Sequence, residues 1–183
     1  MTAPKPFAIS EKPSFPKMSM IRVLFVCLGN ICRSPLAEGL LLKLLAEKGY
    51  SQQVGVDSAG TSAYHIGQPA DARTLRNAAA HQVHLPSRAR QISFADFYDF
   101  DYILTADNAV HKMVLHQAQA AQKQHQAPIK AQIALLRPFG EPAESAVPDP
   151  YYGGEEGFEA VFQILTRATQ GFFNHLQQTH FPD

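Results

Sequence analysis

The 183-residue chain has few cysteines, no tryptophan and no excess of charge of either sign. Its two cysteines, Cys27 and Cys32, lie close together in sequence, and such a pair cannot staple a domain of this size. This scarcity argues against a secreted disulfide scaffold and favours the reducing cytoplasm. The 16 basic and 16 acidic residues give a net charge of zero. Composition therefore supports neither nucleic acid nor an anionic membrane as a partner.

Long apolar runs are also missing from the sequence. The longest fall far short of the roughly 20 residues that a membrane-spanning helix needs, so no membrane partner is predicted. Residues 1–20 contain four prolines and no apolar core of the kind found in a signal peptide. We therefore expect a flexible, uncleaved leader at 1–20 and one domain over 21–179, because the length suits a single hydrophobic core.

Apolar periodicity predicts alternating strands and helices. Residues 20–28, MIRVLFVCL, form a continuous apolar run that is typical of a strand buried on both faces. The next segment, 34–49, repeats leucine at helical spacing, with Ser34 as the expected N-cap and Gly49 as the expected stop. Further strands are expected around 53–60, 101–107 and 132–136, with helices over about 70–83, after 108 and from about 155.

This alternation predicts a single α/β domain, in which a four-stranded parallel sheet has right-handed crossovers and helices on both faces. In such folds ligands bind at the carboxyl ends of the strands. The loop VCLGNICRSP, residues 26–35, lies at the end of the first strand. The Gln-rich stretch 117–128 has no apolar periodicity and is interpreted as a solvated helix extension and loop.

The loop 26–35 has the properties of an oxyanion site. A loop that opens directly into a helix points several backbone N–H groups at one place, and the helix dipole adds partial positive charge there. The loop contains no lysine and lacks GxxxxGK[ST], so a nucleotide P-loop is a poor match. Arg33 instead offers a planar fork for two phosphate oxygens. In this electropositive environment Cys27 is expected to form a nucleophilic thiolate.

These features predict covalent phosphoryl transfer. Cys27 would attack phosphorus, while the loop amides and Arg33 would hold the equatorial oxygens of the transition state. The spacing Cys-x5-Arg is weak evidence alone, because a buried strand cysteine often acts as a small hydrophobe. The preceding strand, the Gly29–Asn30 turn and the following helix start favour the catalytic interpretation.

Several segments carry a resemblance to a known family: CLGNICRSPLAEG, DSAGTSAYHIGQPAD, SRARQIS, FDYILTADN and PDPYYGG. Together they resemble the low-molecular-weight protein tyrosine phosphatases, from about Ile21 to the end of the last helix. The resemblance implies a phosphotyrosine phosphatase I-like fold and hydrolysis of phosphotyrosine in proteins, and of small aryl phosphates, through a phosphocysteine intermediate. It implies no metal or other cofactor. The implied partners are a phosphotyrosine-containing protein and a phosphate or other oxyanion.

The resemblance also assigns catalytic roles. It implies that Cys27 is the nucleophile, that Arg33 clamps the phosphate, and that Asp149 is the general acid. A phenolate leaving group gains from protonation, and the same carboxylate can then activate water. On sequence alone Asp149, within Pro-Asp-Pro, would be taken for a solvated turn. The residues implied to bind substrate are Leu28, Gly29, Asn30, Ile31, Cys32, Ser34, Tyr64 and Tyr151.

Two of these residues are implied to support the loop. Ser34 would stabilise the thiolate, and Asn30 would hold the loop in shape by hydrogen bonds, with Ser58 among its partners. Some relatives carry a histidine in that network where this chain has Ser87. The support of the loop is therefore expected to differ here.

The implied substrate specificity rests on three side chains. Tyr64 and Tyr151 would wall a cleft that is deep enough for phosphotyrosine and too deep for phosphoserine, although many relatives carry tryptophan at the Tyr64 position. Related protein-arginine phosphatases have threonine where this chain has Ile31. Ile31 therefore favours tyrosine phosphate over arginine phosphate.

The sequence leaves two other functions open. An arsenate reductase of the same fold would pass a disulfide to cysteines beyond the loop, and the chain has none after Cys32. A non-catalytic phosphate-binding or phosphotyrosine-binding module should have lost the nucleophile or the acid, and both are present. Cys32 itself either packs behind the loop or, as the resemblance implies, forms a reversible disulfide with an oxidised Cys27. The eight histidines show no metal-ligand set.

Overall fold

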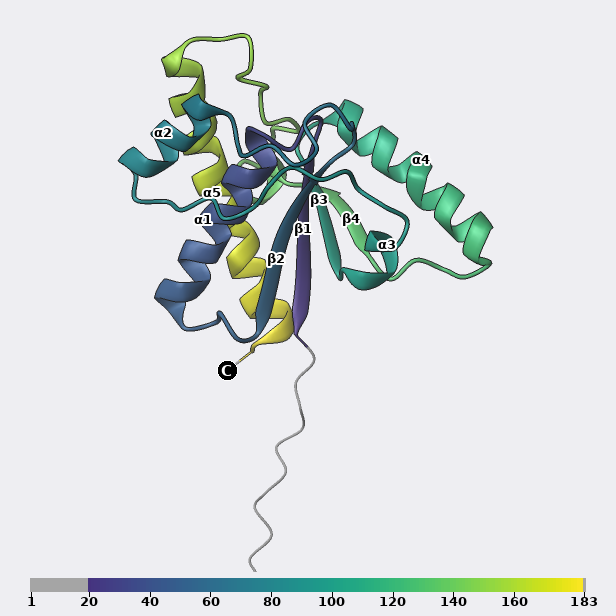
Figure 1. Cartoon of the computed structure of the whole chain (residues 1–183). Coiled ribbons are helices and arrows are strands. Elements are labelled where there is room, and N and C mark those ends of the chain that lie inside the picture. The colour runs from purple at the N-terminus through teal and green to yellow at the C-terminus, as the bar shows by residue number, and fades with distance from the viewer. Residues whose placement is uncertain (1–19, 183) are drawn as a thin grey trace, which may run out of the picture.

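The computed structural model describes residues 20–182, so the predicted leader at 1–20 lies outside the described residues except for Met20. The elements follow the predicted alternation of strand and helix (Figure 1). In chain order they are β1 (Ile21–Cys27), α1 (Arg33–Lys48), β2 (Val54–Gly60), α2 (Ala72–Ala80), α3 (Asp96–Asp99), β3 (Tyr102–Thr105), α4 (Asn108–His125), β4 (Gln132–Leu135), the 3-10 helix η1 (Arg137–Phe139) and α5 (Glu155–His180).

The four strands form one parallel sheet in the order β2-β1-β3-β4. The central strand β1 pairs with both neighbours, so that Val23 lies opposite Val56 on one side and Tyr102 on the other. Because the strands are parallel, their carboxyl ends meet at one edge of the sheet. Figure 1 shows that the start of β1 and the end of α5 lie at the opposite edge. The structure thus confirms the predicted four-stranded parallel sheet.

Alternate side chains of β1 face two separate hydrophobic cores, as expected for a strand with a period of two. Val23 and Phe25 pack into the core under α1 and α5, whereas Leu24 and Val26 pack into the core under α4. All four side chains are at most 1% exposed. This double burial explains the continuous apolar run, and it confirms that helices cover both faces of the sheet.

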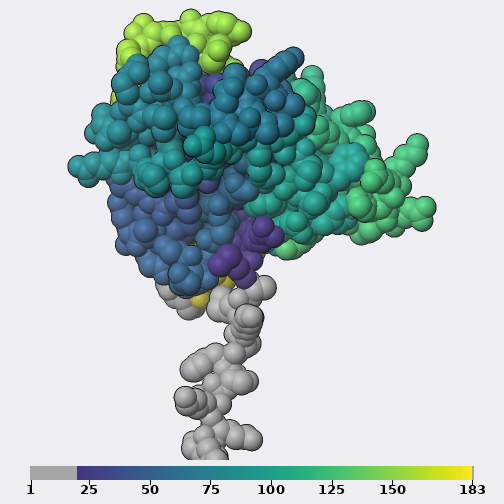
Figure 2. All heavy atoms as spheres, viewed as in Figure 1, coloured from purple at the N-terminus to yellow at the C-terminus, as the bar shows by residue number. Residues whose placement is uncertain are grey.

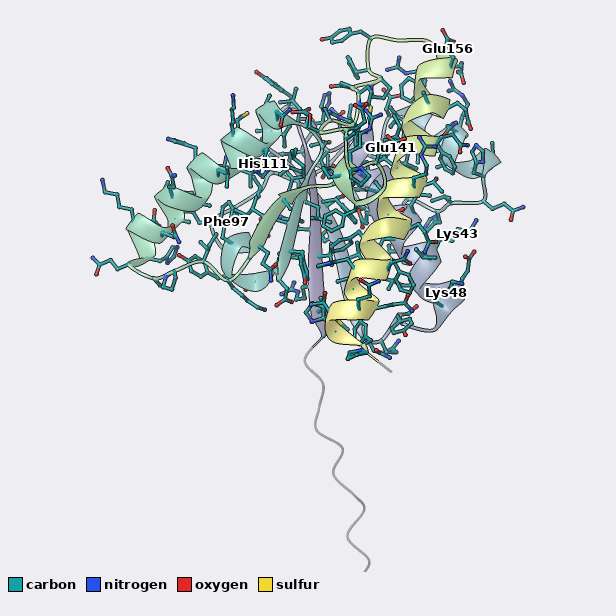
Figure 3. The ribbon with its side chains drawn as sticks, turned by 180° about the vertical axis from the view of Figure 1, so that it is seen from behind. Lys43, Lys48, Phe97, His111, Glu141 and Glu156 are labelled. Carbon is teal, nitrogen blue, oxygen red and sulfur yellow. The ribbon has the colours of Figure 1, made fainter. Side chains whose placement is uncertain are left out.

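The long helix α5 covers one face of the sheet, as the view from behind shows (Figure 3). Its buried stripe contains Phe158, Val161, Phe162, Ile164, Leu165, Ala168, Thr169, Phe172, Phe173 and Leu176. Glu141, labelled in Figure 3, lies beside α5 and pairs with Arg167 at 2.6 Å. Within residues 20–182 no helix has both the length and the apolar character needed to cross a membrane.

The start of α1 differs from the prediction. The helix begins at Arg33 with Cys32 in the N-cap position, and no side chain caps it. The prediction that Ser34 is the N-cap is therefore wrong, because its hydroxyl is used within the loop instead. The uncapped first turn keeps its N–H groups available to an anion. The end of α1 is as predicted, with Gly49 in the left-handed region at φ 81°.

Two other helices also depart from their predicted form. Helix α2 is shorter than expected, because the Asp71 side chain caps it and Gln82 turns into the left-handed region soon after its end. The Gln-rich stretch 117–128 forms an extension of α4 to His125 followed by a loop, as predicted, but two of its residues are not solvated. Its Ala118 and Ala121 are buried against the sheet, and small alanines left little periodicity to detect.

Candidate active site

The loop after β1 curls around the sulfur of Cys27. The backbone N–H of Asn30 donates to Sγ at 3.3 Å, and the Ser34 hydroxyl lies 3.0 Å from the same atom. The end of β2 approaches this loop closely. A Cβ on Gly60 would lie 2.8 Å from the carbonyl oxygen of Leu28, so only glycine fits there without movement. The loop is thus held around the thiol by neighbouring backbone.

Asn30 fixes the shape of the loop, as predicted. Its φ is 55°, a left-handed conformation that asparagine tolerates better than most residues. Its amide Nδ2 donates to Ser34 Oγ at 2.8 Å and to Ser58 Oγ at 2.9 Å, while its Oδ1 accepts from the N–H of Arg90 at 3.0 Å. Ser34 Oγ accepts from Asn30, and its own proton has two neighbouring acceptors, Cys27 Sγ at 3.0 Å and the Ala59 carbonyl oxygen at 3.3 Å.

Behind Ser58 lies a buried carboxylate that sequence reasoning missed. The hydroxyls of Ser58 and Ser87 both donate to Oε2 of Glu38, each at 2.6 Å. Burial raises the pKa of Glu38, although the two hydroxyl donors partly oppose it. Ser87 thus joins the network through Glu38 and through the Ser58 hydroxyl, 3.4 Å from its own, and does not contact Asn30 directly. The spacing in sequence could have indicated Glu38, because it lies one helical turn after Ser34 on the same face of α1.

Arg33 is almost fully buried and is fixed by three acceptors. Nη1 donates to Asp107 Oδ2 at 2.6 Å and to the carbonyl oxygen of Val147 at 3.0 Å, and Nη2 lies 3.3 Å from Asp149 Oδ2. Burial would lower the pKa of Arg33, but the Cys27 sulfur and the Asp107 and Asp149 carboxylates together raise it. The guanidinium therefore stays charged, and its orientation is set before any phosphate binds.

Asp107 is a second residue that sequence reasoning missed. Burial would raise its pKa, but the hydrogen bonds from the Val110 N–H and from Arg33 outweigh burial and lower it. Its Oδ1 also caps α4. An aspartate that directly follows β3 and precedes a helix lies at the carboxyl edge of the sheet, and this position was the signal that could have found it.

Asp149 reaches the site from a segment far away in the sequence. It lies 116 positions after Arg33, in the irregular stretch between η1 and α5. Its side chain is 43% exposed, and Oδ1 accepts from the N–H of Tyr151 at 3.1 Å. The structure therefore brings together Cys27, Arg33 and Asp149, the three residues predicted to be catalytic.

One cavity opens over the loop. It is lined by Cys27, Leu28, Gly29, Ile31, Cys32, Arg33, Ser62, Tyr64, His65, Asp149, Tyr151 and Tyr152. Asn30 and Ser34, predicted to bind substrate, are not among the lining residues because they are buried beneath the sulfur. Ser62, His65 and Tyr152 were not predicted. Tyr64 is 83% exposed and Tyr151 38% exposed, so the two predicted walls stand at the mouth.

Cys32 has a different environment from Cys27. It packs with Ile31, Ala89 and Phe158, and burial raises its pKa to about 12. Both cysteines are free thiols. Cys32 is therefore a protonated thiol at neutral pH.

A hollow lined by a thiol, a buried guanidinium and an exposed carboxyl, at the carboxyl edge of a parallel sheet, suits one chemistry. The thiol can attack, the guanidinium can hold an oxyanion, and the carboxyl can move a proton. Fold and site together define a cysteine-dependent phosphate-ester hydrolase.

Comparison with known proteins identifies the family. The sequence model of "Low molecular weight phosphotyrosine protein phosphatase" matches residues 22–180. The rat protein of that name is 39% identical over 158 residues, which cover 86% of this chain and 95% of the relative. A protein tyrosine phosphatase structure from Entamoeba histolytica superposes with a TM-score of 0.76 at 37% identity, covering 86% of this chain and 97% of its own. The chain therefore belongs to the low molecular weight phosphotyrosine protein phosphatase family, as its motifs predicted.

One similar structure bears on specificity. The Drosophila arginine phosphatase superposes with a TM-score of 0.80 at 33% identity, and the match covers 86% of this chain and 98% of that one. The Drosophila arginine phosphatase and the phosphotyrosine phosphatases therefore share one fold. The choice of substrate therefore depends on the side chains around the loop and not on the architecture.

Proposed function

We propose that this protein hydrolyses phosphotyrosine in proteins through a phosphocysteine intermediate. One observation carries the proposal: Cys27 Sγ lies in one cavity with the Arg33 guanidinium and the Asp149 carboxyl. Arg33 is already oriented by Asp107, so it loses little freedom when it binds a phosphate.

The reaction takes two steps in this geometry. The loop amides and Arg33 hold the phosphoryl oxygens, and the Cys27 thiolate forms the S–P bond while the bond to the tyrosine oxygen breaks. Asp149 gives its proton to the departing phenolate. Its carboxylate then takes a proton from water, which attacks phosphorus and releases phosphate and the thiolate. Entry of the phosphate replaces the direct contact between Arg33 and Asp149.

The lining residues support a tyrosine-specific site. Tyr64 and Tyr151 offer aromatic rings at the mouth of the cavity, where a phosphotyrosine ring would lie, and rings of this kind attract one another. Ile31 offers an apolar contact where protein-arginine phosphatases, by family resemblance, have threonine. Arginine phosphate is therefore the disfavoured substrate.

Phosphate release from three matched peptides tests the proposal, with phosphotyrosine, phosphoserine or phosphoarginine in one sequence at mildly acidic pH with a chelator. We expect the phosphotyrosine peptide to be hydrolysed at least about tenfold faster than either other peptide. Preference for phosphoarginine, no hydrolysis of any peptide, or dependence on added metal would contradict the proposal.

Asp149→Asn should lower kcat/KM by roughly 10²–10⁴ for phenyl phosphate and phosphotyrosine, because the poor leaving group then departs without a proton. The fall in kcat/KM should be much smaller for p-nitrophenyl phosphate, because its leaving group is already acidic. The measurement is kcat/KM over a series of aryl phosphates. An equal loss across the series would show that Asp149 is structural and not the acid.

Cys32 is proposed to protect Cys27 from irreversible oxidation. Peroxide would convert the Cys27 thiolate to a sulfenic acid, and the Cys32 thiol would attack that sulfur, forming a disulfide and releasing water. Because the pKa of Cys32 is raised to about 12, disulfide formation should accelerate as pH rises. Two free thiols in one loop suit the reducing cytoplasm, which we propose as the location.

Cys32→Ser should retain most of its activity but fail to recover with a thiol reductant after peroxide treatment, whereas the unaltered protein recovers. Phosphate should protect both proteins by occupying the loop. Mass spectrometry of the oxidised protein should find a disulfide between Cys27 and Cys32. If recovery is the same without Cys32, or if no such disulfide is found, Cys32 only packs behind the loop.

A further inference from the structure

The segment that carries Asp149 has few attachments to the rest of the domain. Before Asp149, the Val147 N–H donates to the Ala106 carbonyl oxygen at 2.8 Å, and Arg33 donates to the Val147 carbonyl oxygen. After Asp149, residues 150–154 belong to no helix or strand and are mostly exposed. The part that follows the acid therefore needs another support.

Arg73 provides that support from α2. Its Nη1 donates to the carbonyl oxygen of Tyr151 at 2.9 Å. Among the described residues, the other hydrogen bonds of 150–154 stay local, reaching only Asp149 and the first turn of α5, so this bond alone joins 150–154 to a segment distant in sequence. In the space-filling view the yellow-green residues around the start of α5 lie at the top of the molecule, next to the blue-teal residues of α2 (Figure 2).

The Arg73 guanidinium is itself held rigidly. Nε and Nη2 donate to the two carboxylate oxygens of Asp71 at 3.0 and 2.9 Å, a bidentate pair that fixes the plane of the group. Its Cζ lies 5.4 Å from the ring centre of Tyr151 and 4.6 Å from that of Phe158. Two aromatic rings and one carboxylate therefore set the direction in which Nη1 points.

Asp71 in turn is attached to the anion loop. Its backbone N–H donates to the carbonyl oxygen of Ile31 at 2.7 Å, and its Oδ1 caps α2 by accepting from the Arg73 N–H. On the other side of Arg73, the Tyr151 N–H donates to Asp149 Oδ1 at 3.1 Å. A continuous series of contacts thus joins the loop that holds the phosphate to the carboxyl that donates the proton.

We propose that Arg73 is a positioning residue for this reaction, and the proposal rests on the function proposed above. Arg73 fixes the Tyr151 peptide relative to the anion loop, and that peptide orients the Asp149 carboxyl toward the leaving group. Without Arg73, phosphate still binds and Cys27 still attacks, but Asp149 delivers its proton poorly. The loss should therefore depend on the leaving group.

The test uses Arg73→Met, which keeps much of the apolar stem, and Arg73→Lys, which keeps the charge but cannot bridge Asp71 and Tyr151. We expect kcat/KM to fall about tenfold for phenyl phosphate and less than about twofold for p-nitrophenyl phosphate. The matched control is Arg76→Met on the same helix, whose ion pair with Glu155 is exposed. It should stay within about twofold of the unaltered protein for both substrates.

Two further measurements separate positioning from structural damage. The rate at which iodoacetate alkylates Cys27, and the phosphate concentration that protects it, should be unchanged in both Arg73 variants. In an Asp149→Asn background, Arg73→Met should cause no further loss for phenyl phosphate, because the acid is already gone. An equal loss for both leaving groups, an equal loss in both backgrounds or weaker phosphate protection would overturn the proposal. A wild-type protein without phosphatase activity would instead refute the proposed function.

Discussion

Cys27→Ser is expected to abolish turnover while phosphate and vanadate still bind. A serine hydroxyl stays protonated at neutral pH and is a poor nucleophile without a base, so kcat should fall by roughly 10⁴-fold or more. The groups that hold the oxyanion remain, because Arg33 is fixed by Asp107 and the loop by Asn30. Binding and chemistry should therefore separate in this variant.

Cys32→Ser is the matched control for this experiment, since it makes the same change in the same loop. It should keep most of the activity, because Cys32 packs against Ile31, Ala89 and Phe158 and has no role in either step of the proposed reaction. The phosphate affinity of each variant is measured by calorimetry. Its turnover is measured with p-nitrophenyl phosphate. Residual turnover within about tenfold of the unaltered protein for Cys27→Ser would refute the nucleophile assignment.

Arg33→Lys should be nearly as damaging as loss of the nucleophile. A lysine ammonium is a point charge and cannot contact Asp107, the Val147 carbonyl oxygen and two phosphate oxygens at once. We expect kcat/KM to fall by roughly 10²–10³, the size of effect seen when a preorganised oxyanion donor is lost. Phosphate binding should weaken as well, which distinguishes this variant from Cys27→Ser.

Arg88→Lys provides a matched control, because Arg88 is exposed and donates only to the Gly67 carbonyl oxygen among the described residues. Its kinetics should equal those of the unaltered protein. Thermal unfolding of Arg33→Lys should be measured too, since the substitution changes an almost fully buried side chain and its ion pair with Asp107. Activity of folded Arg33→Lys within a few-fold of the unaltered protein would show that Arg33 does not clamp the phosphate.

Local patterns were enough to predict much of the fold. The run from Val23 to Val26 is apolar because both faces of β1 are buried, and this regularity is visible in sequence. The end of α1 was predictable because Gly49 tolerates a left-handed φ. The start of α1 was not, because Ser34 has the chemistry of an N-cap but contacts Cys27, and only the folded loop decides between the two uses.

The candidate site divides in the same way. Cys27 and Arg33 lie in one short loop, so a sequence motif can show them together. Asp149 was assigned through family resemblance, because its own sequence context is that of a turn. Glu38 and Arg73 act through contacts between distant segments, Glu38 with Ser58 and Arg73 with Tyr151, which no local pattern encodes.

The phosphocysteine intermediate can be detected by mass spectrometry of the acid-quenched enzyme during turnover of a phosphotyrosine peptide. We expect one phosphoryl group on the peptide that contains Cys27, attached to its sulfur. The adduct should be absent from Cys27→Ser. Turnover with no phosphorylated peptide at any quench time, or with the phosphoryl group on another residue, would contradict the phosphocysteine mechanism.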